Sequence, residues 1–199
     1  MPKEYSLFGI STGGSAEIKM AAKCPKAIIT ATTIDEKGLA LTRKEINKTE
    51  YKDRILCKIE DCGKPWQAKD DYFDFCYARL VLHYLTKDEL SVALKEMRRT
   101  LKVGAKAFIV VRSVDEPELK VSQTFFDKTT GFIIYTAFTG EIMHRQFFTE
   151  GSLRKTLETA GFKTEYIRTI HEQCYGDYER EVKNPNLNIL IETCVKKIN

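Results

Sequence analysis

The sequence predicts an α/β protein built on a doubly wound, mostly parallel sheet. Segments typical of strands and of helices alternate along most of the chain. The strand segments are also continuously apolar, as in KAIITATTI at 26–34 and AKAFIVVRS at 105–113. Continuously apolar strands are buried on both faces, as in a parallel sheet with helices on either side. The length of 199 residues fits a single domain over 1–199.

Seven segments have the composition of strands. They are 5–9, 26–34, 54–61, 72–78, 105–113, 162–170 and 187–197. No clear helical pattern separates the last two, so we expect them to form an antiparallel pair at one edge of the sheet.

The helical segments are marked by their capping residues. Thr86 and Glu89 have the spacing of a capping box, and apolar residues follow at helical intervals. Gly104 is suited to end that helix in a left-handed conformation. The other predicted helices are 15–23, 36–46 with Asp35 as N-cap, 80–85, and 149–160 with Thr149 as N-cap and Gly161 at its end.

Residues 114–148 interrupt the alternation. Gly131 and Gly140 separate short aromatic runs here, which predicts a hairpin or an irregular cap within the single domain. The segment follows the fifth strand, at the carboxyl edge of the sheet, where ligands bind in open α/β folds. We therefore expect this cap to contribute to a ligand site.

Charge and cysteine usage narrow the classes of function. The formal charge is +4 and no long basic run is present, so nucleic acid is not indicated as a partner. No apolar run reaches the length of a membrane span. The six cysteines form no C-x-x-C pair and the three histidines are isolated, so we expect no metal site. This usage predicts a reduced, cytoplasmic protein.

Two stretches carry a family resemblance. The segment 71–113, DYFDFCYARLVLHYLTKDELSVALKEMRRTLKVGAKAFIVVRS, resembles the central segment of the class I S-adenosylmethionine-dependent methyltransferases. RQFFTEGSLRKTLETAGF at 145–162 is similar to a later helix of the same family. The matching residues in the first stretch are Phe73, Asp74, Ala78, Leu82, His83, Leu85, Leu101, Lys102 and Gly104.

The resemblance implies a Rossmann-like, seven-stranded sheet with S-adenosylmethionine over the carboxyl ends of its first strands. The family has a loop of the form D-x-G-x-G-x-G after the first strand, where glycine lets the backbone approach the cofactor closely. LFGISTGG keeps Gly9 and Gly13, but it has Ser11 in place of the middle glycine and Leu7 in place of the acid. The resemblance therefore implies a degenerate loop in which Gly9, Ser11 and Gly13 meet the cofactor.

The ends of the second and third strands are implied to hold the adenosine part of the cofactor. The family's ribose-binding acid corresponds to Asp35 in one alignment register. In the other register it corresponds to Thr33, followed by Ile34, and Asp35 is then the helix cap; this register needs no gap. A threonine cannot accept two ribose hydroxyls as a carboxylate does. After the third strand, Glu60 or Asp61 is the implied acid, and the backbone of Cys62 follows it.

Other residues are candidates for the methyl-transfer end of the site. Tyr77 and Ala78 follow the fourth strand and are implied to lie near the methyl group. His83 is a candidate general base, with a structural role as the alternative. The candidate substrate contacts are Arg79, which suits a carboxylate, and Tyr135, His144 and Arg145 from the cap.

The sequence therefore predicts an S-adenosylmethionine-dependent methyltransferase that acts on an unidentified acceptor, with a small-molecule substrate as its partner. The alternative is a methyltransferase fold that has lost its cofactor and binds a protein partner. Leu7, Thr33 and the short segment before Tyr5 favour that alternative, because the family usually covers the cofactor with a helix there. A nucleotide-binding enzyme of another doubly wound family is a third reading.

Overall fold

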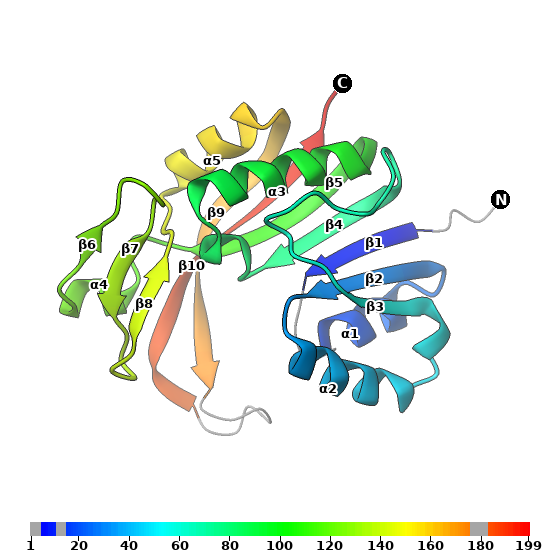
Figure 1. Cartoon of the computed structure of the whole chain (residues 1–199), viewed down its shortest axis with the longest axis horizontal. Helices are drawn as coiled ribbons and strands as arrows, with labels where there is room; N and C mark the ends of the chain where they lie inside the picture. The colour runs from blue at the N-terminus through cyan, green and yellow to red at the C-terminus, as the bar shows by residue number, and fades with distance from the viewer. Residues whose placement is uncertain (1–4, 11–14, 176–182) are drawn as a thin grey trace.

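The protein is an α/β fold centred on one seven-stranded sheet (Figure 1). The computed structural model describes residues 5–10, 15–175 and 183–199, and the side chains of 16–173 and 187–199. The strand order is β3-β2-β1-β4-β5-β10-β9. The order reverses between β1 and β4, which is where ligands bind in sheets of this type. The Rossmann-like arrangement expected from the sequence is confirmed.

Parallel and antiparallel pairings divide this sheet into two parts. Strands β3, β2, β1, β4 and β5 pair in parallel, whereas β10 is antiparallel to both β5 and β9. The antiparallel pairing expected of the last two strands is therefore present. The strands are β1 Tyr5–Ile10, β2 Ala27–Thr33, β3 Ile55–Ile59, β4 Phe73–Arg79, β5 Leu101–Arg112, β9 Phe162–Tyr175 and β10 Lys183–Lys197.

Helices cover both faces of the sheet. Figure 1 shows α1 and α2 on one side, near β1 to β3, and α3 and α5 on the other side, over β4, β5, β9 and β10. The buried residues form two clusters that match this division, a small one under α1 and α2 and a larger one under α3 and α5. The helices are α1 Ser15–Lys23, α2 Glu36–Asn47, α3 Lys87–Thr100, α4 Pro117–Val121 and α5 Glu150–Thr159, with short 3₁₀ turns η1 Lys52–Arg54 and η2 Leu82–Tyr84.

The capping residues act as the sequence predicts. Asp35 accepts the backbone N–H of Lys37 at 3.0 Å and begins α2. Thr86 and Glu89 form a complete capping box at the start of α3. Thr149 begins α5 in the same way, with Ser152 as its partner. These local bonds satisfy backbone groups that the helices leave unpaired at their ends.

Two of the predicted helices differ from the prediction in type or extent. The apolar segment 80–85 is not an α-helix, because Leu80 has a φ of +55° and Leu85 is already extended, which leaves only the turn η2 between them. Helix α3 ends at Thr100 rather than near Gly104, because Leu101 pairs with Phe73 as part of β5. Gly104 does have the expected positive φ, +81°, but it lies within β5, where the pairing with β4 shifts register.

The cap at 114–148 is more regular than an irregular loop. It contains α4 and a second sheet of three antiparallel strands, β6 Phe125–Phe126, β7 Ile133–Thr136 and β8 Ile142–Arg145. Gly131 and Gly140 have φ values of +80° and +85° at the turns of this sheet. Figure 1 shows the cap and the far ends of β9 and β10 beyond the carboxyl edge of the main sheet.

Within the described residues, no helix combines the length and apolar character needed to cross a membrane.

Candidate cofactor site

A cavity of about 540 Å³ lies where β2, β3 and β4 end. Its volume is in the range of small-molecule sites. The lining residues come from three chain segments that the sheet brings together. They are Thr32, Thr33, Ile34, Asp35, Glu60, Asp61, Cys62, Arg79, Leu80, Val81, Tyr84, Leu85 and Glu89.

The end of β2 contributes Thr33 to the cavity. Thr33 is the last residue of β2, and its Oγ1 accepts the backbone N–H of Asp35 at 3.1 Å. Asp35 is occupied as the cap of α2. Asp35 is the helix cap, as in the second alignment register, and the contact of Thr33 with a ribose stays a prediction. Ile34 between them is 71% exposed and offers an apolar surface at the cavity rim.

The end of β3 contributes a carboxylate with an unused oxygen. Glu60 is 9% exposed, and its Oε1 accepts from Lys58 Nζ at 2.9 Å and from the Gln67 backbone N–H at 3.0 Å. Its Oε2 is buried and has no hydrogen-bond partner among the described residues. A buried carboxylate oxygen needs a donor, so a ligand donor fits here.

Of the two acids proposed to bind the cofactor, Asp61 has fewer oxygens left for a ligand. Its Oδ1 accepts the Gly63 backbone N–H at 2.9 Å, and its Oδ2 lies 3.2 Å from Lys64 Nζ. Both oxygens therefore hold the local turn. Cys62 lines the cavity and is itself buried, which raises the pKa of its thiol to about 12 and keeps it protonated.

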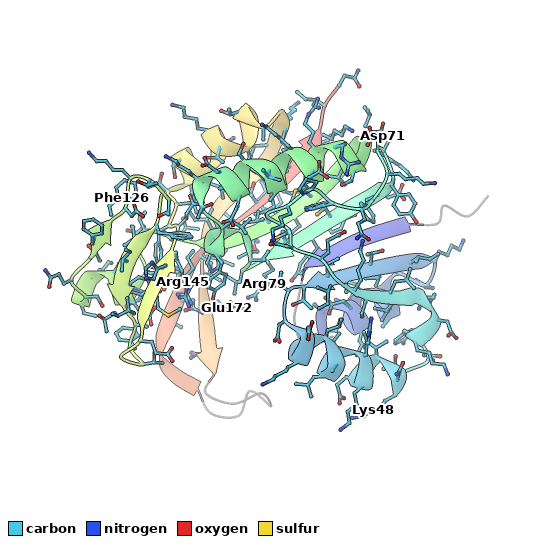
Figure 2. All side chains as sticks on the ribbon, viewed as in Figure 1. Lys48, Asp71, Arg79, Phe126, Arg145 and Glu172 are labelled. Carbon is cyan, nitrogen blue, oxygen red and sulfur yellow. The ribbon has the colours of Figure 1, made fainter. Side chains whose placement is uncertain are left out.

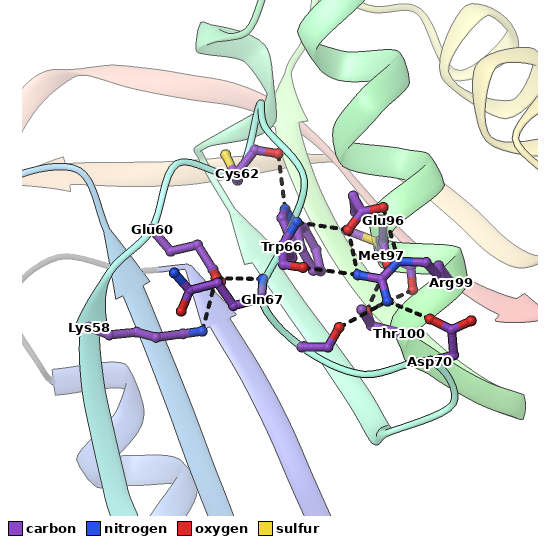
Figure 3. A network of polar contacts seen from close by, with 11 residues as sticks. Lys58, Glu60, Cys62, Trp66, Gln67, Asp70, Glu96, Met97, Arg99 and Thr100 are labelled. Atoms are coloured by element: carbon purple, nitrogen blue, oxygen red, sulfur yellow. Dashed lines mark hydrogen bonds and ion pairs between the residues drawn. The ribbon is translucent and has the colours of Figure 1, made fainter.

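The loop after β3 is anchored by a polar network around Trp66 and Arg99 (Figure 3). Trp66 Nε1 donates to the Cys62 carbonyl at 3.2 Å, and its backbone N–H donates to Glu96 Oε2 at 2.8 Å. Arg99 donates to the carbonyls of Trp66 and Ala68 and to the carboxylates of Glu96 and Asp70. Apart from the bonds from Trp66 Nε1 to Cys62 and from Arg99 to Glu96, these contacts join residues about thirty positions apart, so no local sequence pattern predicts them.

The end of β4 contributes one of the three residues proposed there, Arg79, to the cavity. Arg79, Leu80 and Val81 line the cavity, whereas Tyr77 and Ala78 do not. Ala78 is fully buried in the core, and Tyr77 stacks on Phe108 with ring centroids 5.9 Å apart. The proposed contacts of Tyr77 and Ala78 with the cofactor stay predictions.

The glycine loop is described only in part. Gly9 lies in β1, paired with Ala31 and Tyr77 of the neighbouring strands. Ser11 and Gly13 lie outside the described residues, and their proposed contacts with the cofactor stay predictions.

His83 lies away from the cavity, in the interior. It is 1% exposed, and neither ring nitrogen has a hydrogen-bond partner among the described residues. Burial, together with the charges of Arg112 and Arg145, lowers the pKa of His83 to about 3. The ring is therefore neutral at pH 7 and a weak proton acceptor, which favours the structural alternative over the general base.

The cap reaches the site through Arg145. Its guanidinium lies 5.0 Å from the ring centroid of Tyr84, a cavity residue, and its Nη1 donates to Tyr135 Oη at 2.7 Å. Tyr135 Oη donates in turn to Glu118 Oε2 at 3.2 Å. His144 is exposed and packs edge-on against Phe132, at 6.4 Å between ring centroids. Of the three cap residues proposed as substrate contacts, Arg145 and Tyr135 lie together, and His144 is separate from them.

Arg79 has a partner far along the chain. Its Nη2 donates to both carboxylate oxygens of Glu172 in β9. Figure 2 shows Arg79, Glu172 and Arg145 in the region between the cap, the far part of β9 and the end of β4.

A second hollow in the structure contains none of the predicted site residues. It also has a volume of about 540 Å³ and lies between the start of β4, α3 and the end of α5. There Lys197 Nζ pairs with Asp71 Oδ1 at 2.7 Å and Arg98 Nε donates to the Gly161 carbonyl at 3.3 Å, so these cations are bound internally. The part of the chain that the structure describes holds no group of three or more side chains suited to a metal.

The strand order and the cavity at its reversal define a Rossmann-like protein that binds a small ligand. A family model described as a methyltransferase domain matches residues 8–109, which is more than half of the chain. The chain therefore belongs to the methyltransferase domain family. S-adenosylmethionine is the cofactor of this class of methyltransferase.

Several solved structures have the same fold. An S-adenosylmethionine-dependent methyltransferase from Methanosarcina mazei is 19% identical, with a TM-score of 0.74 over 100% of this chain and 94% of that one. A protein from Pyrococcus horikoshii is 16% identical, with a TM-score of 0.72 over 99% and 84%. The 1,6-didemethyltoxoflavin-N1-methyltransferase of Burkholderia thailandensis is 15% identical, with a TM-score of 0.63 over 99% and 72%. No curated protein is matched by sequence.

Proposed function

We propose that this protein transfers a methyl group from S-adenosylmethionine to a small-molecule acceptor in the cavity at the ends of β2, β3 and β4. The observation that carries the proposal is Glu60, whose buried Oε2 faces no donor within the described residues. A ribose hydroxyl or an adenine amine would supply that donor. When bound, S-adenosylmethionine supplies a methyl group on a positively charged sulfur, which is already activated for displacement.

The other residues at this end of the cavity suit an adenosine group. The Thr33 hydroxyl already accepts a backbone N–H, so its own proton is free to donate to a ribose oxygen. Ile34 offers an exposed apolar side chain to the flat face of a base. Four carboxylates line the cavity, from Asp35, Glu60, Asp61 and Glu89, and an acidic lining favours ligand donors.

The opposite end of the cavity suits the acceptor. Leu80, Val81, Tyr84 and Leu85 form a mostly apolar wall next to Arg79. Such a wall excludes water and positions the acceptor atom, and this positioning is a large part of catalysis for a displacement at an activated methyl group. The neighbour from Burkholderia thailandensis was solved with a small molecule and S-adenosylhomocysteine bound, which supports a small acceptor here.

The first test is calorimetric titration of S-adenosylhomocysteine into the wild type, Glu60→Gln and Glu158→Gln. Glu158 is an exposed residue of α5, and its substitution serves as the control. We expect the wild type and the control to bind equally, and Glu60→Gln to bind roughly tenfold to a hundredfold more weakly, because a charge-assisted hydrogen bond is lost.

Two results would contradict the proposal. Equal binding by Glu60→Gln and the wild type would remove Glu60 from the cofactor site. An absence of binding by the wild type at millimolar ligand would favour the alternative, a fold that has lost its cofactor and serves as a binding module.

A further inference from the structure

The cavity at the ends of β2, β3 and β4 is rich in negative charge. Its described lining contains four carboxylates and one guanidinium, namely those of Asp35, Glu60, Asp61, Glu89 and Arg79. Glu60 has Lys58 Nζ beside it at 2.9 Å. Asp61 has Lys64 Nζ beside it at 3.2 Å. The other two carboxylates have no ion-pair partner in the part of the chain that the structure describes.

Glu172 binds the guanidinium of this lining from outside the cavity. Arg79 Nη2 donates to both oxygens of the Glu172 carboxylate, and Figure 2 shows the two residues between the end of β4 and the far part of β9. Glu172 is not itself among the lining residues. Each of the two side chains is about one-third exposed, at 31% and 32%. An ion pair with this exposure adds little to stability, so either member can be replaced in a folded protein.

The ion pair leaves the surroundings of the cavity with an excess of negative charge. When the partners of the lining residues are included, five carboxylates face three cationic groups in the described part of the chain. One carboxylate oxygen, Glu60 Oε2, is also buried and has no hydrogen-bond partner among the described residues. Charges interact more strongly in a site shielded from water than in bulk water, so this excess attracts a ligand of positive charge.

From this arrangement, we infer that Glu172 makes the cavity selective for a positively charged ligand by neutralising Arg79. S-adenosylmethionine carries a positive charge on sulfur that its product, S-adenosylhomocysteine, lacks. The cavity therefore holds the cofactor more tightly than the product, which favours release of the product and uptake of a new cofactor. Glu172 is a positioning residue that acts through Arg79 and takes no part in the displacement. This inference rests on the proposed function, because it concerns the cofactor of the same site.

A purely structural role for the ion pair makes a different prediction. The pair joins residues 93 positions apart, at the end of β4 and in β9. If its only role were to hold these two strands together, its loss would loosen the cavity and weaken all ligands of the same shape alike. A change of charge instead alters the difference in affinity between a cationic ligand and a neutral one. The ratio of two affinities therefore distinguishes the two roles.

Sinefungin and S-adenosylhomocysteine are matched probes, because both contain the adenosine and amino-acid parts of the cofactor. Sinefungin has a carbon with a protonated amine in place of the sulfur, so it is the cationic member of the pair. Each probe is titrated calorimetrically into the wild type at about 50 mM and about 500 mM salt. We expect sinefungin to bind at least about fivefold more tightly at the lower salt, and this preference to shrink at the higher salt, because salt screens charges. Equal or tighter binding of S-adenosylhomocysteine, or a preference that salt does not change, would overturn the inference.

Three substitutions test the role of Glu172. Glu172→Gln removes the carboxylate bound to Arg79 and keeps the guanidinium in the cavity lining, so we expect the preference for sinefungin to fall by about fivefold or more. Arg79→Gln removes the guanidinium and keeps the carboxylate of Glu172, so we expect the preference to rise. Glu192→Gln is the control, because Glu192 of β10 pairs with Arg168 of β9 at 2.6 Å, outside the cavity lining. We expect it to keep the preference of the wild type.

Glu172→Gln and Arg79→Gln break the same ion pair, so shifts of the preference in opposite directions identify charge as the cause. An unchanged or higher preference in Glu172→Gln would overturn the inference, and so would an unchanged or lower preference in Arg79→Gln. A wild type that binds neither probe at millimolar concentration would overturn the proposed function, and this inference with it. A wild type that binds S-adenosylhomocysteine without preferring sinefungin would overturn the inference alone.

Discussion

Thr33 Oγ1 accepts the backbone N–H of Asp35 at 3.1 Å, and this bond closes the turn between β2 and α2. Asp35 is thereby held as the cap of α2, and Thr33, the last residue of β2, lines the cavity beside it. The relationship explains how a chain with an acid two positions away presents a hydroxyl where relatives of this class are expected to present a carboxylate.

Restoring that carboxylate is expected to strengthen cofactor binding. A carboxylate in Thr33→Asp can accept two ribose hydroxyls and can still accept the Asp35 N–H. We expect S-adenosylhomocysteine to bind roughly tenfold more tightly to Thr33→Asp than to the wild type, because a charge-assisted hydrogen bond is gained. Thr49→Asp is the control, because Thr49 is half-buried and lies after α2, outside the cavity lining. Thr42 is less suitable, because it is buried. Weaker binding by Thr33→Asp would indicate that the cavity is already too acidic at this point.

The anchoring of the Trp66 loop by Arg99 gives a prediction about stability. Arg99→Met removes the donors to Trp66, Ala68, Glu96 and Asp70. We expect the free energy of unfolding in urea to fall by about 2–4 kcal/mol, because several partly buried acceptors lose their donor. Arg154→Met is the control; Arg154 is exposed and lies 3.9 Å from Glu158, so its loss is expected to change stability by less than about 0.5 kcal/mol.

The same variant is expected to weaken cofactor binding, because the loop carries Cys62 at the cavity. A stable Arg99→Met with unchanged affinity would show that the network is dispensable for the site.

Two glycines allow the cost of backbone strain to be measured separately from the cost of a side-chain clash. Gly161 and Gly140 both have a φ of +85°, which disfavours any residue with a Cβ. A Cβ on Gly161 would lie 2.6 Å from Arg98 Nε, whereas a Cβ on Gly140 would meet nothing within 4 Å. We expect Gly140→Ala to cost about 1 kcal/mol of unfolding free energy and Gly161→Ala about 1–3 kcal/mol more, measured in urea. Equal costs would show that the Arg98 side chain moves aside freely.

His83 gives a prediction about pH. Its pKa is lowered from 6.5 to about 3 in the folded protein, so between these values the unfolded chain binds more protons than the folded one. The stability therefore decreases as the pH falls below about 6.5, with a contribution from His83 of up to about 1.4 kcal/mol per pH unit, and this contribution is constant at higher pH.

The measurement is urea unfolding of the wild type, His83→Gln and His144→Gln between about pH 4.5 and pH 7.5. We expect a shallower loss of stability with acid in His83→Gln than in the wild type. His144 is exposed, and His144→Gln is expected to follow the wild type. Parallel curves for all three proteins would mean that His83 titrates normally in the fold.

The sequence by itself determined the features that depend on neighbouring residues. The apolar strand segments, the caps at Asp35, Thr86 and Thr149, and the positive φ of Gly104 are set by local chemistry, and each is present in the structure. The order of apolar strands and helices was also enough to predict a doubly wound sheet with parallel strands, because parallel strands need a helical crossover between them.

The tertiary structure alone decided which side chains meet. Arg79 and Glu172 are 93 positions apart, and Arg145 reaches Tyr84 from the second sheet of the cap. The sequence cannot predict such pairs, because nothing near either residue in the chain indicates which distant residue will lie beside it after folding. The same holds at the end of β4, where Arg79 and Leu80 line the cavity while Tyr77 and Ala78 are not among its lining residues. The elements were therefore predictable from local preferences, while the composition of the site depended on the distant contacts that fix where each strand ends.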